Sequence, residues 1–274
     1  MREAIPSRSI DINRVKARMD ELTKRQEEMA QRFRNAGRDE KTSALRQFLF
    51  MLLSKHLSRF AFTRFITQNL GQRANYVQWL IDTFSKKPDL ALSREKIWDK
   101  IISGVARDRP VVVWEFGVAW GYSTDWWLKR LPQKNLNWHG FDRFTGLPRD
   151  WRNYKAGDLS AGGVPPAIND PRVRWYVGDV EDTLPKMDIR RDPTAQWVIL
   201  FDLDIYEPTS FAWKRLQQHL RPGDLLYFDE AFDDDERRVL NESVVRNPEI
   251  EVSLFACSPL ALALRVESVK FQRS

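Results

Sequence analysis

The chain has 274 residues, with 44 Lys plus Arg, 38 Asp plus Glu and a single cysteine, Cys257, and its formal charge is +6. One cysteine excludes a disulfide scaffold and a cysteine-rich zinc site, and three scattered histidines disfavour a histidine zinc cluster. Apolar residues make up 42%, which is enough for a hydrophobic core. Neither a secretory signal nor a transmembrane segment is recognisable, so we expect a soluble, cytoplasmic protein.

The first 110 residues are markedly basic. They carry 23 basic and 13 acidic side chains, whereas the remainder carries 21 and 25. Such an excess suits an anionic membrane, an acidic partner or nucleic acid, but no nucleic-acid-binding motif accompanies it. We therefore expect no nucleic-acid partner. Docking of the basic half to an anionic membrane or partner stays open as the alternative to an enzyme.

Helical periodicity dominates this basic half. Within residues 1–40, a seam with heptad spacing is formed by Ile12, Val15, Met19, Leu22, Gln26, Met29 and Phe33. It predicts either a short coiled coil joining the subunits of a homo-oligomer or an amphipathic helix on its own domain. Residues 41–108 predict a helical extension that serves as a lid or contacts the acceptor or another subunit. Its helices are expected at 43–70, 76–83 and 93–105.

From residue 109 to 274, buried strands alternate with helices. The predicted strands are 111–116, 137–141, 173–177, 197–201, 224–228, 249–255 and 261–266. The predicted helices between them are 123–131, 210–220 and 236–246. This order predicts an α/β fold with a doubly wound, mainly parallel, Rossmann-like sheet of seven strands. Ligands of such sheets bind at the carboxyl ends of the strands, where the informative residues of this chain fall.

A glycine-containing turn follows the first strand, in the string Glu115-Phe-Gly117-Val-Ala-Trp-Gly121-Tyr-Ser123. Glycines let the backbone approach a ligand, and the helix that follows offers unpaired N–H groups. Asp142 ends the second strand 21 residues after Gly121, where an acid can accept hydrogen bonds from ribose hydroxyls. Asp179 ends the third strand and could face an adenine amine. For both aspartates the alternative is a purely structural turn residue.

The chemistry of this turn disfavours a diphosphate ligand. The string matches neither the dinucleotide fingerprint GxGxxG nor the GKS or GKT of a phosphate-binding loop. A buried Glu115 would also repel phosphate. A nucleoside with a cationic or zwitterionic tail suits this acid better, and S-adenosylmethionine (SAM) is such a molecule.

Acidic doublets follow two strands that we expect to be neighbours. Asp202 and Asp204 come after the fourth strand, and Asp229 and Glu230 come after the fifth. Clustered carboxylates repel each other unless a cation neutralises them, and oxygen ligands favour Mg²⁺, Ca²⁺ or Mn²⁺. The doublets therefore predict a metal site. The alternative is that one aspartate caps a helix and the second doublet faces solvent.

Four motifs in order, EFGVAWGYS, GFDRFTGLPRDW, DLDIYEPT and LRPGDLLYFDEAF, resemble the macrocin O-methyltransferase (TylF/MycF-like) family of class I SAM-dependent enzymes. The likeness covers about residues 110–235. It implies a SAM-dependent O-methyltransferase that acts on a hydroxyl of a sugar, glycoside or other polyol in natural product biosynthesis. It also implies Mg²⁺ dependence.

The resemblance also implies roles for individual residues. The methionine end of SAM would be lined by Glu115, Gly117, Gly121 and Ser123. Asp142 would bind the ribose, and Asp179 with Val180 would lie near the adenine. Residues that would bind Mg²⁺ are Asp202, Asp229 and Glu230, with Asp204 in the same shell or behind it. At two positions the chain departs from the family, with Arg143 where serine is usual and Glu230 where aspartate is usual.

The implied mechanism needs a base that accepts the proton of the acceptor hydroxyl. Asp202 and Asp204 are the candidates, and their roles are not separable by sequence. His139 is a further possibility, although its place within the second strand favours a structural role. A related metal-dependent reaction on the same fold, such as hydroxylation in an antibiotic pathway, is the rival enzymatic function.

Overall fold

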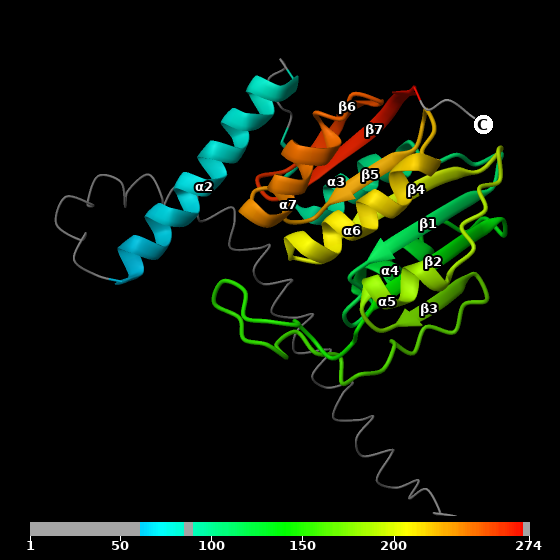
Figure 1. The fold of residues 1–274 in the computed structure, drawn as a ribbon, viewed down its shortest axis with the longest axis horizontal. Coiled ribbons are helices and arrows are strands. Elements are labelled where there is room, and N and C mark those ends of the chain that lie inside the picture. The colour runs from blue at the N-terminus through cyan, green and yellow to red at the C-terminus, as the bar shows by residue number, and fades with distance from the viewer. Residues whose placement is uncertain (1–60, 85–89, 271–274) are drawn as a thin grey trace, which may run out of the picture. The chain divides into compact units, whose positions relative to one another are not determined.

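The structure, a computed structural model, describes residues 61–84 and 90–270 of the chain. Seven strands form one sheet in the order β3-β2-β1-β4-β5-β7-β6 (Figure 1). The strands are β1 (Val111–Phe116), β2 (Leu136–Asp142), β3 (Val173–Val177), β4 (Gln196–Phe201), β5 (Leu225–Phe228), β6 (Ile250–Cys257) and β7 (Leu262–Val269). Strands β1 to β5 pair in parallel, whereas β7 is antiparallel to β5 and β6. The predicted doubly wound, mainly parallel sheet of seven strands is confirmed.

Of the predicted helices, those at 93–105, 123–131, 210–220 and 236–246 are present with shifted bounds, whereas 76–83 belongs to a longer helix that also holds residues 61–70, and the short helix Val180–Thr183 was not predicted. They are α2 (Ala61–Phe84), α3 (Arg94–Ser103), α4 (Tyr122–Leu128), α5 (Val180–Thr183), α6 (Tyr206–Leu216) and α7 (Asp234–Val239), with a π turn at Leu240–Val244. The heptad seam of residues 12–33 and the first part, residues 43–60, of the helix predicted at 43–70 lie outside the described residues. None of the helices within residues 61–84 and 90–270 is long and apolar enough to cross a membrane.

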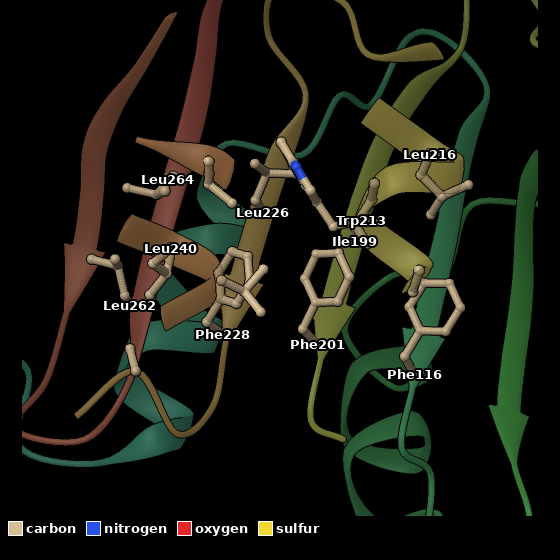
Figure 2. Close-up of a cluster of buried hydrophobic side chains, with 14 of the residues drawn as sticks. Phe116, Ile199, Phe201, Trp213, Leu216, Leu226, Phe228, Leu240, Leu262 and Leu264 are labelled. Carbon is tan, nitrogen blue, oxygen red and sulfur yellow. The ribbon is translucent and has the colours of Figure 1, made fainter. Parts of the chain in front are cut away.

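The core has two apolar layers, one on each face of the sheet. On one face Phe116, Phe201 and Phe228 pack against Trp213 of α6 and Leu240 of the π turn (Figure 2). The other face carries a second cluster, which consists of Val111, Val113, Val198 and Leu200 with Trp98 of α3 and Trp127 of α4. Central parallel strands are buried on both faces, which is why they read in the sequence as continuous apolar runs.

Helix α2 joins the α6–α7 side of this core. Tyr76 and Leu80 are fully buried there. The Tyr76 hydroxyl donates to the Ala261 carbonyl over 2.9 Å, and the Trp79 indole donates to the Asn241 side-chain oxygen over 2.6 Å. These contacts attach α2 to the turn between β6 and β7 and to the π turn after α7.

The position of the site follows from the strand order. The chain leaves the central strand β1 for β2 on one side and returns to β4 on the other, which makes the β1–β4 boundary the topological switch point. Residues that follow these two strands must lie side by side. A Cβ atom added to Gly117 would lie 1.8 Å from the Asp202 carbonyl oxygen, so only glycine fits at this contact. The predicted glycine turn and the first acidic doublet therefore share one edge of the sheet.

Candidate functional site

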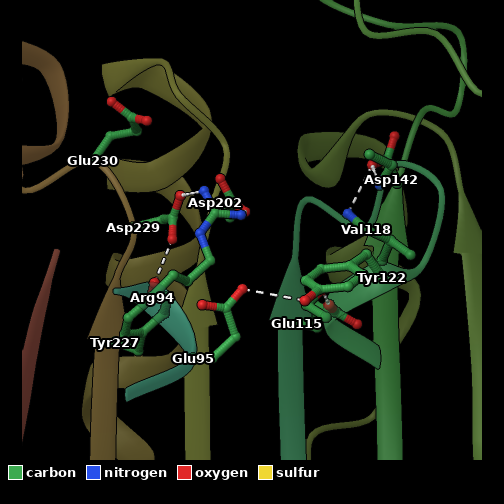
Figure 3. A network of polar contacts seen from close by, with 12 residues as sticks. Arg94, Glu95, Glu115, Val118, Tyr122, Asp142, Asp202, Tyr227, Asp229 and Glu230 are labelled. Carbon is green, nitrogen blue, oxygen red and sulfur yellow. Dashed lines mark hydrogen bonds and ion pairs between the residues drawn. The ribbon is translucent and has the colours of Figure 1, made fainter. Parts of the chain in front are cut away.

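The glycine turn between β1 and α4 is held open by backbone conformation and by Asp142. Gly117 and Gly121 adopt φ angles of +88° and +78°, which side chains disfavour. One oxygen of Asp142 accepts from the Val118 and Ala119 amides over 2.8 and 2.7 Å (Figure 3). The other oxygen accepts from the Phe144 amide over 2.5 Å. Asp142 thus fixes the turn while staying half-buried at the end of β2.

Glu115 is a buried structural partner of the first turn of α4. Its carboxylate is 1% exposed and accepts from the Ser123 hydroxyl, from the Thr124 hydroxyl over 2.5 Å and from the Trp138 indole over 2.8 Å. Burial raises the pKa of Glu115 to about 7, although these three hydrogen bonds oppose the rise. Both oxygens are thus occupied by protein donors. That Glu115 and Ser123 line the methionine end of the cofactor stays a prediction.

The buried Glu115 predicts a pH-dependent stability. Its pKa rises from 4.5 to about 7 on folding, so between these values the folded chain keeps a proton that the unfolded chain releases. The free energy of unfolding contributed by this group therefore falls as the pH rises from about 4.5 to 7 and is level above that. Urea unfolding of the wild type and Glu115→Gln at pH 5 and pH 7.5 measures this, and the stability of the variant should fall less.

The control for this experiment is Glu181→Gln, at an exposed position of α5. This variant should follow the wild type at both pH values. An equal pH dependence of stability in wild type and Glu115→Gln would contradict the assignment to Glu115.

An ion pair that the sequence does not predict lies at the predicted adenine side of the cofactor site. Asp179 precedes α5, is 48% exposed, and lies 2.9 Å from the Arg143 guanidinium. Val180 is buried as the first residue of α5. Arg143, which stands where the resembling family usually has serine, therefore neutralises Asp179, the aspartate predicted to face the adenine. Contact of Asp179 and Val180 with a cofactor stays a prediction.

The acidic doublets come together at the ends of β4 and β5, as predicted. Burial, followed by the nearby Asp229, raises the pKa of Asp202 well above its ordinary value. Burial, followed by Glu230 and Asp229, raises the pKa of Asp204 to about 8. Asp204 also holds a left-handed φ of +62°, which is strained for a residue with a side chain. Carboxylates that are this close and this poorly solvated favour sharing protons or cations.

Two arginines supply that positive charge, and the sequence analysis missed both. Arg94, the first residue of α3, donates to Asp229 Oδ2 and lies 4.0 Å from Asp202 Oδ2 (Figure 3). Burial by itself lowers the pKa of Arg94, but the nearby Asp229 and Asp202 raise it by more. The net pKa is above its ordinary value, so the guanidinium stays charged. The Tyr227 hydroxyl donates to the second oxygen of Asp229, which leaves neither oxygen without a protein donor.

The second arginine comes from the β2–β3 connection, residues 143–172. Arg152 lies 2.9 Å from Glu230 Oε2, and its Nη2 lies 2.5 Å from Asp233. Nearby in the same connection, the Trp151 indole donates to Asp235 over 3.2 Å. Arg152 also adopts a left-handed φ of +50°. This connection thus leaves the sheet after β2 and returns to it at β3 after contacting the acids that follow β5.

The connection is closed at its base by its own backbone. The Leu147 amide donates to the Asp158 carbonyl and the Gly157 amide donates to the Leu147 carbonyl, each over 2.9 Å. Leu147 and Trp151 form a small apolar cluster with Ile205, the residue just before α6. Residues 147–158 therefore form a closed loop attached to the acidic side of the site.

The residues fit the two predicted cofactors differently. A backbone turn that only glycine can form, beside a carboxylate fixed at the end of β2, suits the methionine and ribose parts of SAM. The predicted magnesium ligands do not fit Mg²⁺ in this arrangement, because Asp229 is held by Arg94 and Tyr227 and Glu230 is paired with Arg152. Across residues 61–84 and 90–270 no group of three His, Cys, Asp or Glu is arranged to hold a metal ion.

His139 lies away from these acids, in the interior of β2. Its ring stacks on Trp114 with 4.8 Å between centroids, and its Nδ1 is 3.0 Å from the Tyr176 hydroxyl. Burial, followed by Arg174, lowers its pKa to about 4. These contacts give His139 a packing role in the core.

Comparison with known proteins gives likenesses among solved structures. No family model matches the chain, and no curated protein matches it. The calicheamicin methyltransferase CalS11 is similar at 21% identity, with 70% of this chain and 91% of that chain covered and a TM-score of 0.49. The O-methyltransferase NovP is similar at 18% identity, with 64% and 76% covered and a TM-score of 0.38. The SAH-bound methyltransferase PaMTH1 from Podospora anserina is similar at 15% identity, with 72% and 88% covered and a TM-score of 0.41.

Proposed function

We propose that this chain is a SAM-dependent O-methyltransferase that acts on a hydroxyl of a sugar, glycoside or other polyol-type small molecule. One observation carries the proposal. The glycine turn with its fixed Asp142 and the acids Asp202 and Asp204 meet at the same switch point, with Gly117 against the backbone of Asp202. A methyl donor and a proton acceptor would thus lie on adjacent strands.

The residues divide the reaction between them. SAM, when bound, supplies a methyl group activated by a sulfonium sulfur. Gly117 and Gly121 would let the backbone approach it, Asp142 would receive the ribose hydroxyls, and Val180 would lie at the adenine. Asp202 or Asp204 would accept the proton of the acceptor hydroxyl as its oxygen bonds to the methyl carbon and the carbon–sulfur bond breaks, which would leave the demethylated cofactor. The rigid turn and strand ends hold these groups in register, which is a proximity effect.

A calorimetric titration of the purified protein tests the proposal. SAM and its demethylated product should bind in the micromolar range, whereas ATP and NAD should not bind, because the turn lacks a phosphate-binding sequence. A panel of glycosides and nucleotide sugars, incubated with methyl-labelled SAM, then identifies the acceptor by the mass of the product. Binding of ATP or NAD in place of SAM would contradict the proposal.

Three further properties belong to the same proposal. A place in natural product biosynthesis follows from the implied sugar acceptor. Homo-oligomerisation follows from the heptad seam of residues 12–33, which lies outside the described residues. A cytoplasmic location accords with the supply of SAM inside cells. Docking of the basic half to an anionic membrane or partner stays a prediction, because residues 1–60 lie outside the described part.

A further inference from the structure

Arg94 reaches the acidic cluster from a well-anchored helix. Ser93 caps α3 by accepting from the Lys96 amide, and Ile97, Trp98 and Ile101 bury one face of the helix under the sheet. The cap and the buried face fix the first turn of α3. The guanidinium is thereby held at the ends of β4 and β5 (Figure 3). Its Cζ atom lies 5.8 Å from the centroid of the Trp98 ring.

The guanidinium contacts the carboxylates that a metal would need. It is paired with Asp229 on one side and faces Asp202 on the other, 4.0 Å away. The Asp229 side chain is only 2% exposed, and Tyr227 holds its second oxygen. A divalent cation would have to displace both donors, and it would be repelled by the guanidinium as long as Arg94 stayed in place.

The third predicted ligand is held elsewhere. Glu230 points away from Arg94 in Figure 3 and pairs with Arg152, which also binds Asp233. Two fixed guanidinium groups therefore neutralise the carboxylates in separate pairs. Magnesium requires near-octahedral oxygen ligands at about 2.0–2.1 Å, which carboxylates paired in this way do not offer.

We propose that the Arg94 guanidinium takes the place of a divalent cation at Asp202 and Asp229, so that this site works without a metal. The proposal rests on the proposed function for the reaction that the site serves, although the occupancy of the cation position does not depend on it. Arg94 is then a positioning residue. It keeps Asp202 oriented beside the glycine turn. Because its positive charge belongs to the protein, a chelator such as EDTA cannot remove it.

Binding of Mn²⁺, followed by the loss of its free-ion electron paramagnetic resonance signal, tests the proposal without an activity assay. The wild type should leave the signal unchanged at millimolar Mn²⁺. Arg94→Met removes the charge and keeps the length, and it should bind Mn²⁺ about tenfold more tightly or better. Arg94→Gln is a second neutral variant for the case that Arg94→Met does not fold. Arg130→Met is the matched control, since Arg130 stacks on Trp126 and pairs with Asp99, which is not one of the clustered acids, and it should behave as the wild type does.

The outcomes separate this inference from the proposed function. Tight Mn²⁺ binding by the wild type overturns the inference, and so does a folded neutral variant that gains no Mn²⁺ affinity. Turnover that is unchanged by EDTA in the wild type supports it. A protein that binds no SAM but shows the expected Mn²⁺ pattern would end the proposed function and leave the assignment of Arg94 intact.

Discussion

Replacing Asp202 with asparagine is expected to lower methyl transfer by about 10²- to 10⁴-fold, the range typical of a lost general base. Asparagine keeps the size of the side chain, and the backbone bond from the Asp202 amide to the Phe116 carbonyl, 2.8 Å long, does not involve the side chain. SAM affinity should therefore change little. The measurement is formation of the demethylated cofactor at saturating acceptor, with calorimetry for SAM binding.

Two comparisons make this result specific. Asp204→Asn distinguishes the two candidate bases, because the true base should show the larger loss of kcat. Asp234→Asn is the control for an acid near the same edge, since Asp234 is 80% exposed and pairs with Arg237, and it should retain wild-type turnover. Loss of SAM binding in Asp202→Asn would mean that Asp202 belongs to the cofactor site and is not the base.

Gly117→Ala is expected to weaken SAM binding by about 10- to 100-fold or more. Alanine disfavours this left-handed φ by about 1–3 kcal/mol, so the turn of the free variant relaxes away from it and SAM binding must restore it, where every 1.4 kcal/mol is tenfold in affinity. The new Cβ would also lie 1.8 Å from the Asp202 carbonyl oxygen, so the turn must move relative to β4. The measurement is the dissociation constant of SAM by calorimetry, together with the thermal midpoint of unfolding.

Gly157→Ala separates the collision from the backbone strain. Gly157 has the same φ of +88° as Gly117, but a Cβ there meets no atom within 4 Å. This variant should lose stability to a similar strain and keep its SAM affinity. If both variants bound SAM as the wild type does, the glycine turn would not be the cofactor site.

Much of the fold could be predicted from sequence because the central strands are continuous apolar runs. β1 and β3 begin and end at the predicted residues. Helix α6 begins at Tyr206, four residues before the predicted start at Ser210, and therefore includes Pro208 in its first turn. Proline is tolerated within the first turn, where its missing N–H has no helical partner. The insertion of β7 between β5 and β6 depends on long-range pairing that no local pattern encodes.

The site was predictable in part for a similar reason. Acids and glycines that follow strands fall at one edge of the sheet, so the sequence could place Asp202 and Asp229 together. Arg94 was missed because it is 135 residues from Asp229 and lies in a helix without a motif. Arg152 directly follows the quoted string GFDRFTGLPRDW, and the excess of acids after β5 was a signal that a cation had to approach. Sequence reasoning assigned that cation to a metal.

The closed loop of residues 147–158 has a consequence for how such a protein could be retargeted. Its ends are joined by hydrogen bonds between Leu147, Gly157 and Asp158, while Arg152 and Trp151 near its centre contact acids after β5. Neither the strands of the sheet nor the glycine turn include residues of this loop. The loop is therefore an exchangeable module. A loop of different length or sequence, grafted between the same two ends, would change the contacts to the acids after β5 and leave the glycine turn unchanged.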